Sequence, residues 1–179
     1  MTKFKIIIEI LIFTMFCNYA KGQNIDLVQR LVSDNFIIVD SVLNYDKETL
    51  RQIDYNNLKI ELKQWFGNVR IENYIAEEEC NLMLQNISEL NNISTWDKKI
   101  LRQNNIKFIK YKEYKKKRRI IPKHSYSMFS HPLVSRSKKF AIILEEEWCG
   151  MECGSSEIII LIKEKDNWKV VCAIVNWIS

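Results

Sequence analysis

The run of five aliphatic residues from Ile158 to Ile162 is the feature that most constrains how this chain can fold. A strand that is apolar on both sides must be covered on both faces, so this run predicts a central strand of a sheet. The preceding apolar segment around Phe140 to Leu144 and the segment from Trp168 to Ile178 also predict strands. With a tight turn at Asp166 and Asn167, these segments indicate an antiparallel meander.

The chain before residue 105 has a different, helical period. Apolar residues recur at intervals of three and four, as on one face of a helix. This spacing predicts helices over residues 24–38, 56–66 and 76–90, and a short fourth one over 94–102. From residue 105 onward we expect strands, including an extended segment at Ile106, Phe108 and Tyr111. The predicted fold class is therefore α+β, with helices packed on one face of an antiparallel sheet.

The first 22 residues have the layout of a secretory signal peptide. Lys3 and Lys5 precede an apolar run, and Ala20 and Gly22 place small residues before Gln23. We expect cleavage before Gln23 and a single domain over 23–179, with a helical part at 23–104 and a sheet part at 105–179. The predicted location is the periplasm, the cell envelope or the medium. A retained anchor, or a lipid on Cys17, is the alternative.

Four cysteines follow the predicted signal peptide, and an even number in an exported chain favours disulfides. Cys149 and Cys153 flank a turn between two predicted strands, so we expect a structural disulfide between them. Free thiols, a redox pair, or a metal site completed by His124 and His131 are the alternatives. Cys80 and Cys172 are expected to be buried thiols, or to pair with each other. We expect no metal ion and no cofactor.

Residues 107–123 form a strongly basic stretch within a chain of net charge +5. Its densest part predicts a polyanion-binding site at Lys115, Lys116, Lys117, Arg118 and Arg119. For an exported protein the polyanion would be an acidic glycan or a lipid phosphate, and we expect no nucleic acid partner. The alternative is a solvated hairpin or loop.

Imidazole and hydroxyl side chains occur together between His124 and His131, and such groups serve as base and nucleophile in hydrolases. Such an enzyme needs a nucleophile, a base and an orienting acid that converge in space, and the chain has no Gly-x-Ser-x-Gly turn. Hydroxyls beside a proline are also common in turns. Glu145, Glu146 and Glu147 alternate along one predicted strand, so we expect two of them to face solvent.

The last fifty residues contain an ordered constellation of motifs. These are a Ser-x-Pro segment at Ser130–Pro132, a Cys-Gly-x-x-Cys-Gly turn at Cys149–Gly154, Trp168 with Val170, and a closing Trp-x-Ser at Trp177–Ser179. The constellation resembles a group of small exported bacterial proteins of unknown function, which implies export but no activity. The order of helices and strands is also similar to cone-shaped domains of the NTF2-like or cystatin-like kind.

The sequence therefore predicts an exported, non-enzymatic binding or interaction protein. Its partner is expected to be an envelope component, an acidic glycan or a small ligand in a pocket. Two alternatives stay open: a small hydrolase that uses His124 or His131, and a polyanion-binding protein that uses residues 107–123.

Overall fold

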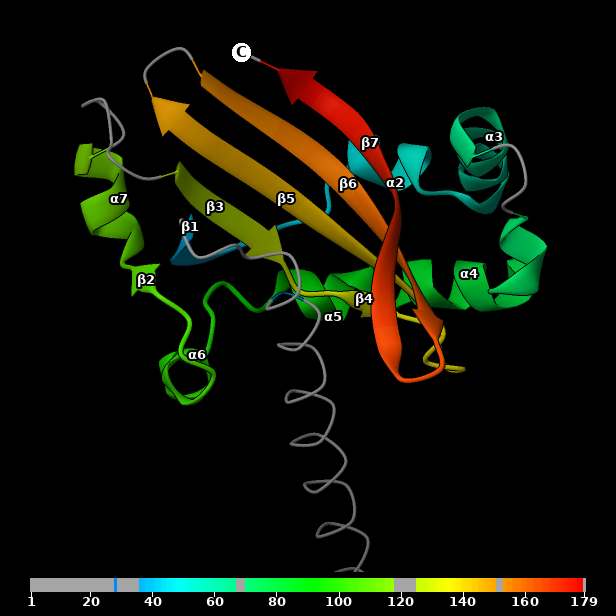
Figure 1. Ribbon diagram of the computed structural model, residues 1–179, viewed down its shortest axis with the longest axis horizontal. Coiled ribbons are helices and arrows are strands. Elements are labelled where there is room, and N and C mark those ends of the chain that lie inside the picture. The colour runs from blue at the N-terminus through cyan, green and yellow to red at the C-terminus, as the bar shows by residue number, and fades with distance from the viewer. Residues whose placement is uncertain (1–27, 29–35, 67–69, 118–124, 151–152, 179) are drawn as a thin grey trace, which may run out of the picture.

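A seven-stranded mixed sheet forms the centre of the protein in this computed structural model (Figure 1). The structure describes residues 28, 36–66, 70–117, 125–150 and 153–178. Six strands follow the order β2-β1-β3-β5-β6-β7, and β4 pairs with β5. The strands are β1 (Phe36–Leu43), β2 (Phe108–Ile109), β3 (Ser125–Ser130), β4 (Leu133–Val134), β5 (Phe140–Gly150), β6 (Cys153–Glu164) and β7 (Asn167–Ile178).

The three C-terminal strands confirm the predicted antiparallel meander. β5 and β6 pair from Phe140 opposite Ile162 to Gly150 opposite Cys153. β6 is flanked on its other side by β7, so Ile158 to Ile162 is indeed in an inner strand. The tight turn lies one residue earlier than predicted: Glu164 pairs with Asn167, and Lys165 and Asp166 form the loop.

The sheet is not entirely antiparallel, which corrects the predicted fold class in one respect. β1 lies between β2 and β3 and runs parallel to both. The predicted helix over residues 24–38 is therefore wrong at its C-terminal end, where Phe36, Ile37 and Ile38 begin β1. Val28 is helical and fully buried, and the rest of that predicted helix lies outside the described residues.

The helices partly match the predicted ones. They are α2 (Lys47–Gln52), α3 (Tyr55–Phe66), η1 (Ile71–Asn73), α4 (Glu77–Gln85), α5 (Ile87–Asn91), α6 (Lys98–Gln103) and α7 (Tyr111–Lys117). α3 confirms the prediction over 56–66, whereas the helix predicted over 76–90 is divided into α4 and α5 at Asn86. α6 begins at Lys98 rather than at residue 94. α7 replaces the strand expected at Tyr111.

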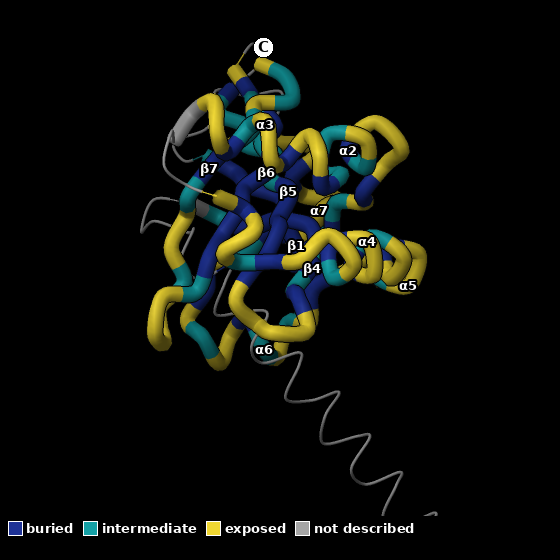
Figure 2. The backbone as a smooth tube through the Cα atoms, turned by 90° about the vertical axis from the view of Figure 1, so that its right-hand side faces the viewer, coloured by how far each residue is buried: buried dark blue, intermediate teal, exposed yellow. Residues whose placement is uncertain are grey.

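Two large hydrophobic clusters cover the two faces of the sheet, and a third, smaller one packs Tyr114 of α7 against residues of β1 and β3. Successive residues of β5 belong to opposite faces, so that Ile142 lies in the first cluster and Ile143 lies in the second. The first cluster includes residues of α2, α3, α4 and α5, and the second includes Leu101 of α6. Helices thus pack against both faces and not against one. Figure 2 shows the strands buried at the centre and the outer turns of α4 and α5 exposed.

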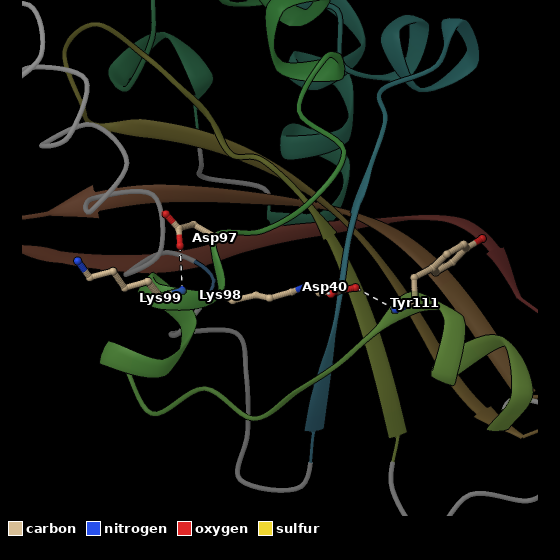
Figure 3. Close-up of polar contacts among 5 residues, drawn as sticks. All are labelled: Asp40, Asp97, Lys98, Lys99 and Tyr111. Atoms are coloured by element: carbon tan, nitrogen blue, oxygen red, sulfur yellow. Dashed lines mark hydrogen bonds and ion pairs between the residues drawn. The ribbon is translucent and has the colours of Figure 1, made fainter.

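Asp40, a buried residue of β1, joins two helices to the sheet (Figure 3). Its Oδ1 accepts a hydrogen bond of 2.9 Å from the backbone N–H of Tyr111, and its Oδ2 lies 3.1 Å from Nζ of Lys98. The first N–H groups of a helix have no partner within the helix, so this carboxylate serves as a remote cap for α7. Asp97 caps α6 locally by accepting from the N–H of Lys99.

Candidate functional site

Four lysines line an open pocket at the end of the sheet where β5 begins and β6 ends. The pocket has a volume of about 500 Å³. We call it the lysine pocket, and its lining residues are Asn73, Tyr74, Ser137, Lys138, Lys139, Lys163 and Lys165. In Figure 1 this is the end where the β6–β7 hairpin turns and the chain enters β5.

Hydrogen bonds hold the turn before β5 in place. Ser135 accepts from the N–H of Lys138 at its carbonyl and from the N–H of Phe140 at its Oγ. The N–H of Ser137 donates to Oε1 of Glu79 on α4 at 2.8 Å. The N–H of Lys163 donates to the carbonyl of Lys139 at 2.8 Å, which joins this turn to β6. The two walls that carry the lysines are therefore fixed relative to each other.

Two of the lysines occupy a backbone conformation that lysine rarely adopts. The φ angles of Lys138 and Lys165 are 55° and 56°. Left-handed backbone costs a residue with a Cβ on the order of 1 kcal/mol, and glycine or asparagine adopts it more readily. Strained residues of this kind concentrate at functional sites. Among the described residues one other non-glycine residue has a positive φ, Asn105, which does not line the pocket.

The charge of the pocket is one-sided. None of its lining residues in the described chain is acidic. Of the carboxylates beside the lining residues, Glu72 pairs with Lys59, Glu164 pairs with Lys169, and Glu79 accepts from the N–H of Ser137. Asp166 follows Lys165 in the same turn, so one acidic residue does adjoin the pocket in sequence. Nζ of Lys163 lies 5.8 Å from the centre of the Trp168 ring, a cation–π contact. The arrangement is suited to holding an anion.

The structure separates this pocket from the basic stretch singled out in the sequence. Lys115, Lys116 and Lys117 are exposed on α7. In Figure 1 this helix lies at the edge of the sheet away from the β6–β7 hairpin. Nζ of Lys115 lies 4.7 Å from the centre of the Tyr111 ring. Arg118 and Arg119 lie outside the described residues, as do the remaining residues up to 123. Because the lysines of the pocket come from two distant turns, no run of charge in the sequence indicated it.

The histidines and hydroxyls considered for a hydrolase have other surroundings. The His131 ring packs against Trp96, with ring centres 4.4 Å apart, and His124 lies outside the described residues. Oγ of Ser130 donates to the Tyr45 hydroxyl at 2.7 Å and accepts from the N–H of Leu144 at 2.9 Å. The Tyr45 hydroxyl in turn donates to backbone carbonyls of His131 and Ile142. Burial raises the pKa of Tyr45, so this network is a neutral, structural joint.

The cysteines show one disulfide and two buried thiols. Cys149 and Cys153 are bonded across the β5–β6 turn, with Cα atoms 5.2 Å apart, as predicted. Cys80 and Cys172 are both free, although both contribute to the first hydrophobic cluster. Burial raises the pKa of each thiol to about 11, so neither is a reactive thiolate at neutral pH. Within the described residues no three metal-ligating side chains are grouped to hold a metal ion.

The glutamates of β5 are more buried than expected. Glu145, Glu146 and Glu147 are all half-buried, so the prediction that two of them face solvent is wrong. The pKa of Glu145 is raised to about 7, mainly by burial. A hydrogen bond with Ser127 lowers it in part, and the charges of Glu147 and Glu157 add smaller increases. By the strand register Glu147 and Glu157 share the face of Glu145, while Glu146 lies on the opposite face.

Comparison with protein-family models, with curated proteins and with solved structures finds no match to this chain. None of the helices that the structure describes is long and apolar enough to span a membrane.

Proposed function

We propose that the protein is an exported, non-enzymatic binding protein that holds an anionic ligand in the lysine pocket. The observation that carries this proposal is the convergence of Lys138, Lys139, Lys163 and Lys165 on one pocket of about 500 Å³ with no acidic lining residue among those described. Four cations in a fixed concave site attract a multiply charged anion more strongly than scattered surface lysines do. The strained backbone at Lys138 and Lys165 adds a second reason to place function there.

Two features support the exported location in this proposal. The first 22 residues have the order of a signal peptide, with basic residues, an apolar run and small residues before Gln23. The bonded pair Cys149 and Cys153 is typical of proteins that mature in an oxidising compartment. The proposed location is the periplasm, the cell envelope or the medium. An NTF2-like or cystatin-like architecture belongs to the proposal as well, supported by helices α2 to α5 packed on a long-stranded sheet.

A second candidate is polyanion binding by α7. It is favoured by the exposure of three consecutive lysines, Lys115, Lys116 and Lys117, in the last turn of the helix. We rank it below the lysine pocket because those side chains project from a convex helix surface. Lys138, Lys139 and Lys165 of the pocket are exposed as well, so the ranking rests on their position around one hollow and not on burial, and attraction at either site is sensitive to salt. A hydrolase that uses His124 or His131 has less support, since the His131 ring is packed against Trp96.

Isothermal titration calorimetry with inorganic pyrophosphate tests the proposal and separates the two basic sites. The double variant Lys139→Gln/Lys163→Gln removes two charges from the pocket, and Lys115→Gln/Lys116→Gln removes two from α7 as a matched control. We expect at least a tenfold loss of affinity for the pocket variant and little change for the control. Equal losses would contradict a site in the pocket, and a loss confined to the α7 variant would favour the second candidate.

A glycine substitution tests whether the strained lysines act through their side chains. Glycine adopts a positive φ without strain, which offsets its greater freedom in the unfolded chain. Lys138→Gly/Lys165→Gly should therefore fold with nearly the stability of the parent and bind pyrophosphate at least tenfold more weakly. Asn105→Gly, at the third such position, should bind as the parent does. Full affinity in the double glycine variant would show that the two side chains are not needed.

A further inference from the structure

We infer that the anion held in the lysine pocket is an acidic saccharide, that is, a sugar that carries carboxylate or sulfate groups as well as free hydroxyls. The inference rests on the proposed function and names the class of ligand for the same site. Its basis is the size of the pocket and the uncharged groups that lie among the lysines.

The pocket is too large for a simple inorganic ion. Ten molecules of liquid water occupy only about 300 Å³, and the pocket has about 500 Å³. Pockets of about 300–1,000 Å³ are of the size that holds a small organic ligand. A sulfate or phosphate ion alone would leave most of the lysines solvated, whereas a disaccharide of moderate size fills such a space.

The lysines stand on two walls, which favours a ligand with more than one acid group. Lys138 and Lys139 belong to the turn before β5, and Lys163 and Lys165 belong to the end of β6 and the turn after it. The backbone hydrogen bond from Lys163 to Lys139 fixes the two walls side by side. A linear ligand with acid groups on successive rings can meet both walls at once.

Three neutral residues distinguish a sugar from a bare phosphate. Asn73 has an amide that both donates and accepts. The hydroxyl of Ser137 lies 3.0 Å from Oγ of Ser135 and has hydrogen-bonding capacity left beyond that contact. Acceptors are of no use to a fully ionised phosphate, but they suit the hydroxyl groups of a sugar. Tyr74 is half-buried against the first hydrophobic cluster and also lines the pocket, so it offers an aromatic surface for the C–H face of a pyranose ring.

Calorimetric titration of the folded protein with defined probes tests the ligand class. The probes are a sulfated uronate disaccharide derived from heparin, the neutral disaccharide maltose, inorganic sulfate and inorganic pyrophosphate, all at one ionic strength. We expect the acidic disaccharide to bind at least tenfold more tightly than sulfate or pyrophosphate, and maltose to bind at least tenfold more weakly than the acidic disaccharide. Asn73→Ala/Ser137→Ala should weaken the acidic disaccharide more than it weakens pyrophosphate.

The outcomes separate this inference from the proposed function. If pyrophosphate binds and the Lys139→Gln/Lys163→Gln variant loses it, but the acidic disaccharide binds no more tightly, the ligand class is wrong and the anion site stands. If pyrophosphate binds best, a phosphate ligand replaces the saccharide. If no probe binds, or if the α7 variant Lys115→Gln/Lys116→Gln loses the disaccharide instead, both the inference and the proposed function fail.

Discussion

At the scale of single residues, Gly154 brings the Cys149–Gly154 turn motif into contact with Trp177 near the end of the chain. A Cβ at this position would lie 3.1 Å from the Glu147 carbonyl, 3.2 Å from the Trp177 ring and 3.3 Å from the Trp148 ring. The two indoles pack with ring centres 5.5 Å apart. The glycine therefore leaves room for two tryptophans from different strands, next to the disulfide that ends the β5–β6 hairpin.

Gly154→Ala should destabilise the protein by about 1–2 kcal/mol, because the added methyl group forces the two indoles or the Glu147 carbonyl to move by a few tenths of an ångström. Urea unfolding followed by tryptophan fluorescence measures the loss. Ser155→Ala is the matched control, since it changes the next residue of β6 without adding an atom. An unchanged urea midpoint for Gly154→Ala would show that the indoles move aside at no cost.

Glu145 makes the stability of the folded protein depend on pH. Its pKa in the folded protein is raised to about 7 by burial and by the neighbouring charges of Glu147 and Glu157. A pKa that folding raises gives stability that is present at acidic pH and is lost as the pH rises through the folded pKa. Since one pKa unit corresponds to about 1.4 kcal/mol, ionisation of Glu145 costs on the order of 3 kcal/mol.

Glu145→Gln should therefore gain stability relative to the parent as the pH rises from 5 to 8. Glutamine retains the shape of the side chain and cannot ionise. The free energy of unfolding in urea at several pH values measures this difference. Glu89→Gln, the same substitution at an exposed residue of α5, should follow the parent at every pH. Parallel curves for Glu145→Gln and the parent would contradict the raised pKa.

At the scale of elements, β1 and α7 depend on each other through Asp40. The Asp40 carboxylate is buried in β1 and caps α7, whereas Asp97 is an exposed local cap of α6. Asp40→Ala should cost about 2–3 kcal/mol, as expected for buried hydrogen bonds to a charged group. Asp97→Ala should cost about 1 kcal/mol, as a usual N-cap does. Thermal unfolding compares the two, and equal losses would contradict the joining role of Asp40.

The elements that the sequence predicted are those with a local signal. β5, β6, β7 and α3 have apolar periods that fix their type without reference to the rest of the chain. β1 was missed because the helical spacing that ends at Phe36 overlaps its first residues, although the run Ile37, Ile38 and Val39 is rich in the β-branched residues that strands favour. Its parallel partners lie far along the chain, so only the folded structure shows them.

α7 and the lysine pocket were missed for the same physical reason. The sequence of α7 reads as a charged loop, and its buried Tyr114 and its cap Asp40 matter only once β1 is in place. The pocket is made by two turns that β5 and β6 bring together. By contrast the disulfide was predicted, because Cys149 and Cys153 are only four residues apart and a tight turn between them brings their Cα atoms close.

At the scale of the whole molecule, the basic side chains form two separate regions on one sheet. The residues of the lysine pocket belong to the end of the sheet where β6 turns into β7. The helix α7, which carries Lys115, Lys116 and Lys117, lies away from that end and beside β3 in Figure 1. If the proposed anion site is correct, a disaccharide contacts the pocket alone, and we expect substitutions in α7 to leave its affinity unchanged.

The mature chain gives the last prediction. If the protein is exported as proposed, it begins at Gln23 and contains one disulfide and two thiols. Intact mass spectrometry of protein recovered from the exporting cell, denatured and alkylated, should show two blocked thiols without reduction and four after it. Peptide mapping should assign the disulfide to Cys149 and Cys153 and the free thiols to Cys80 and Cys172. An uncleaved N-terminus, which retains Cys17, with all five thiols free would contradict the exported location, because an oxidising compartment is what keeps this disulfide formed.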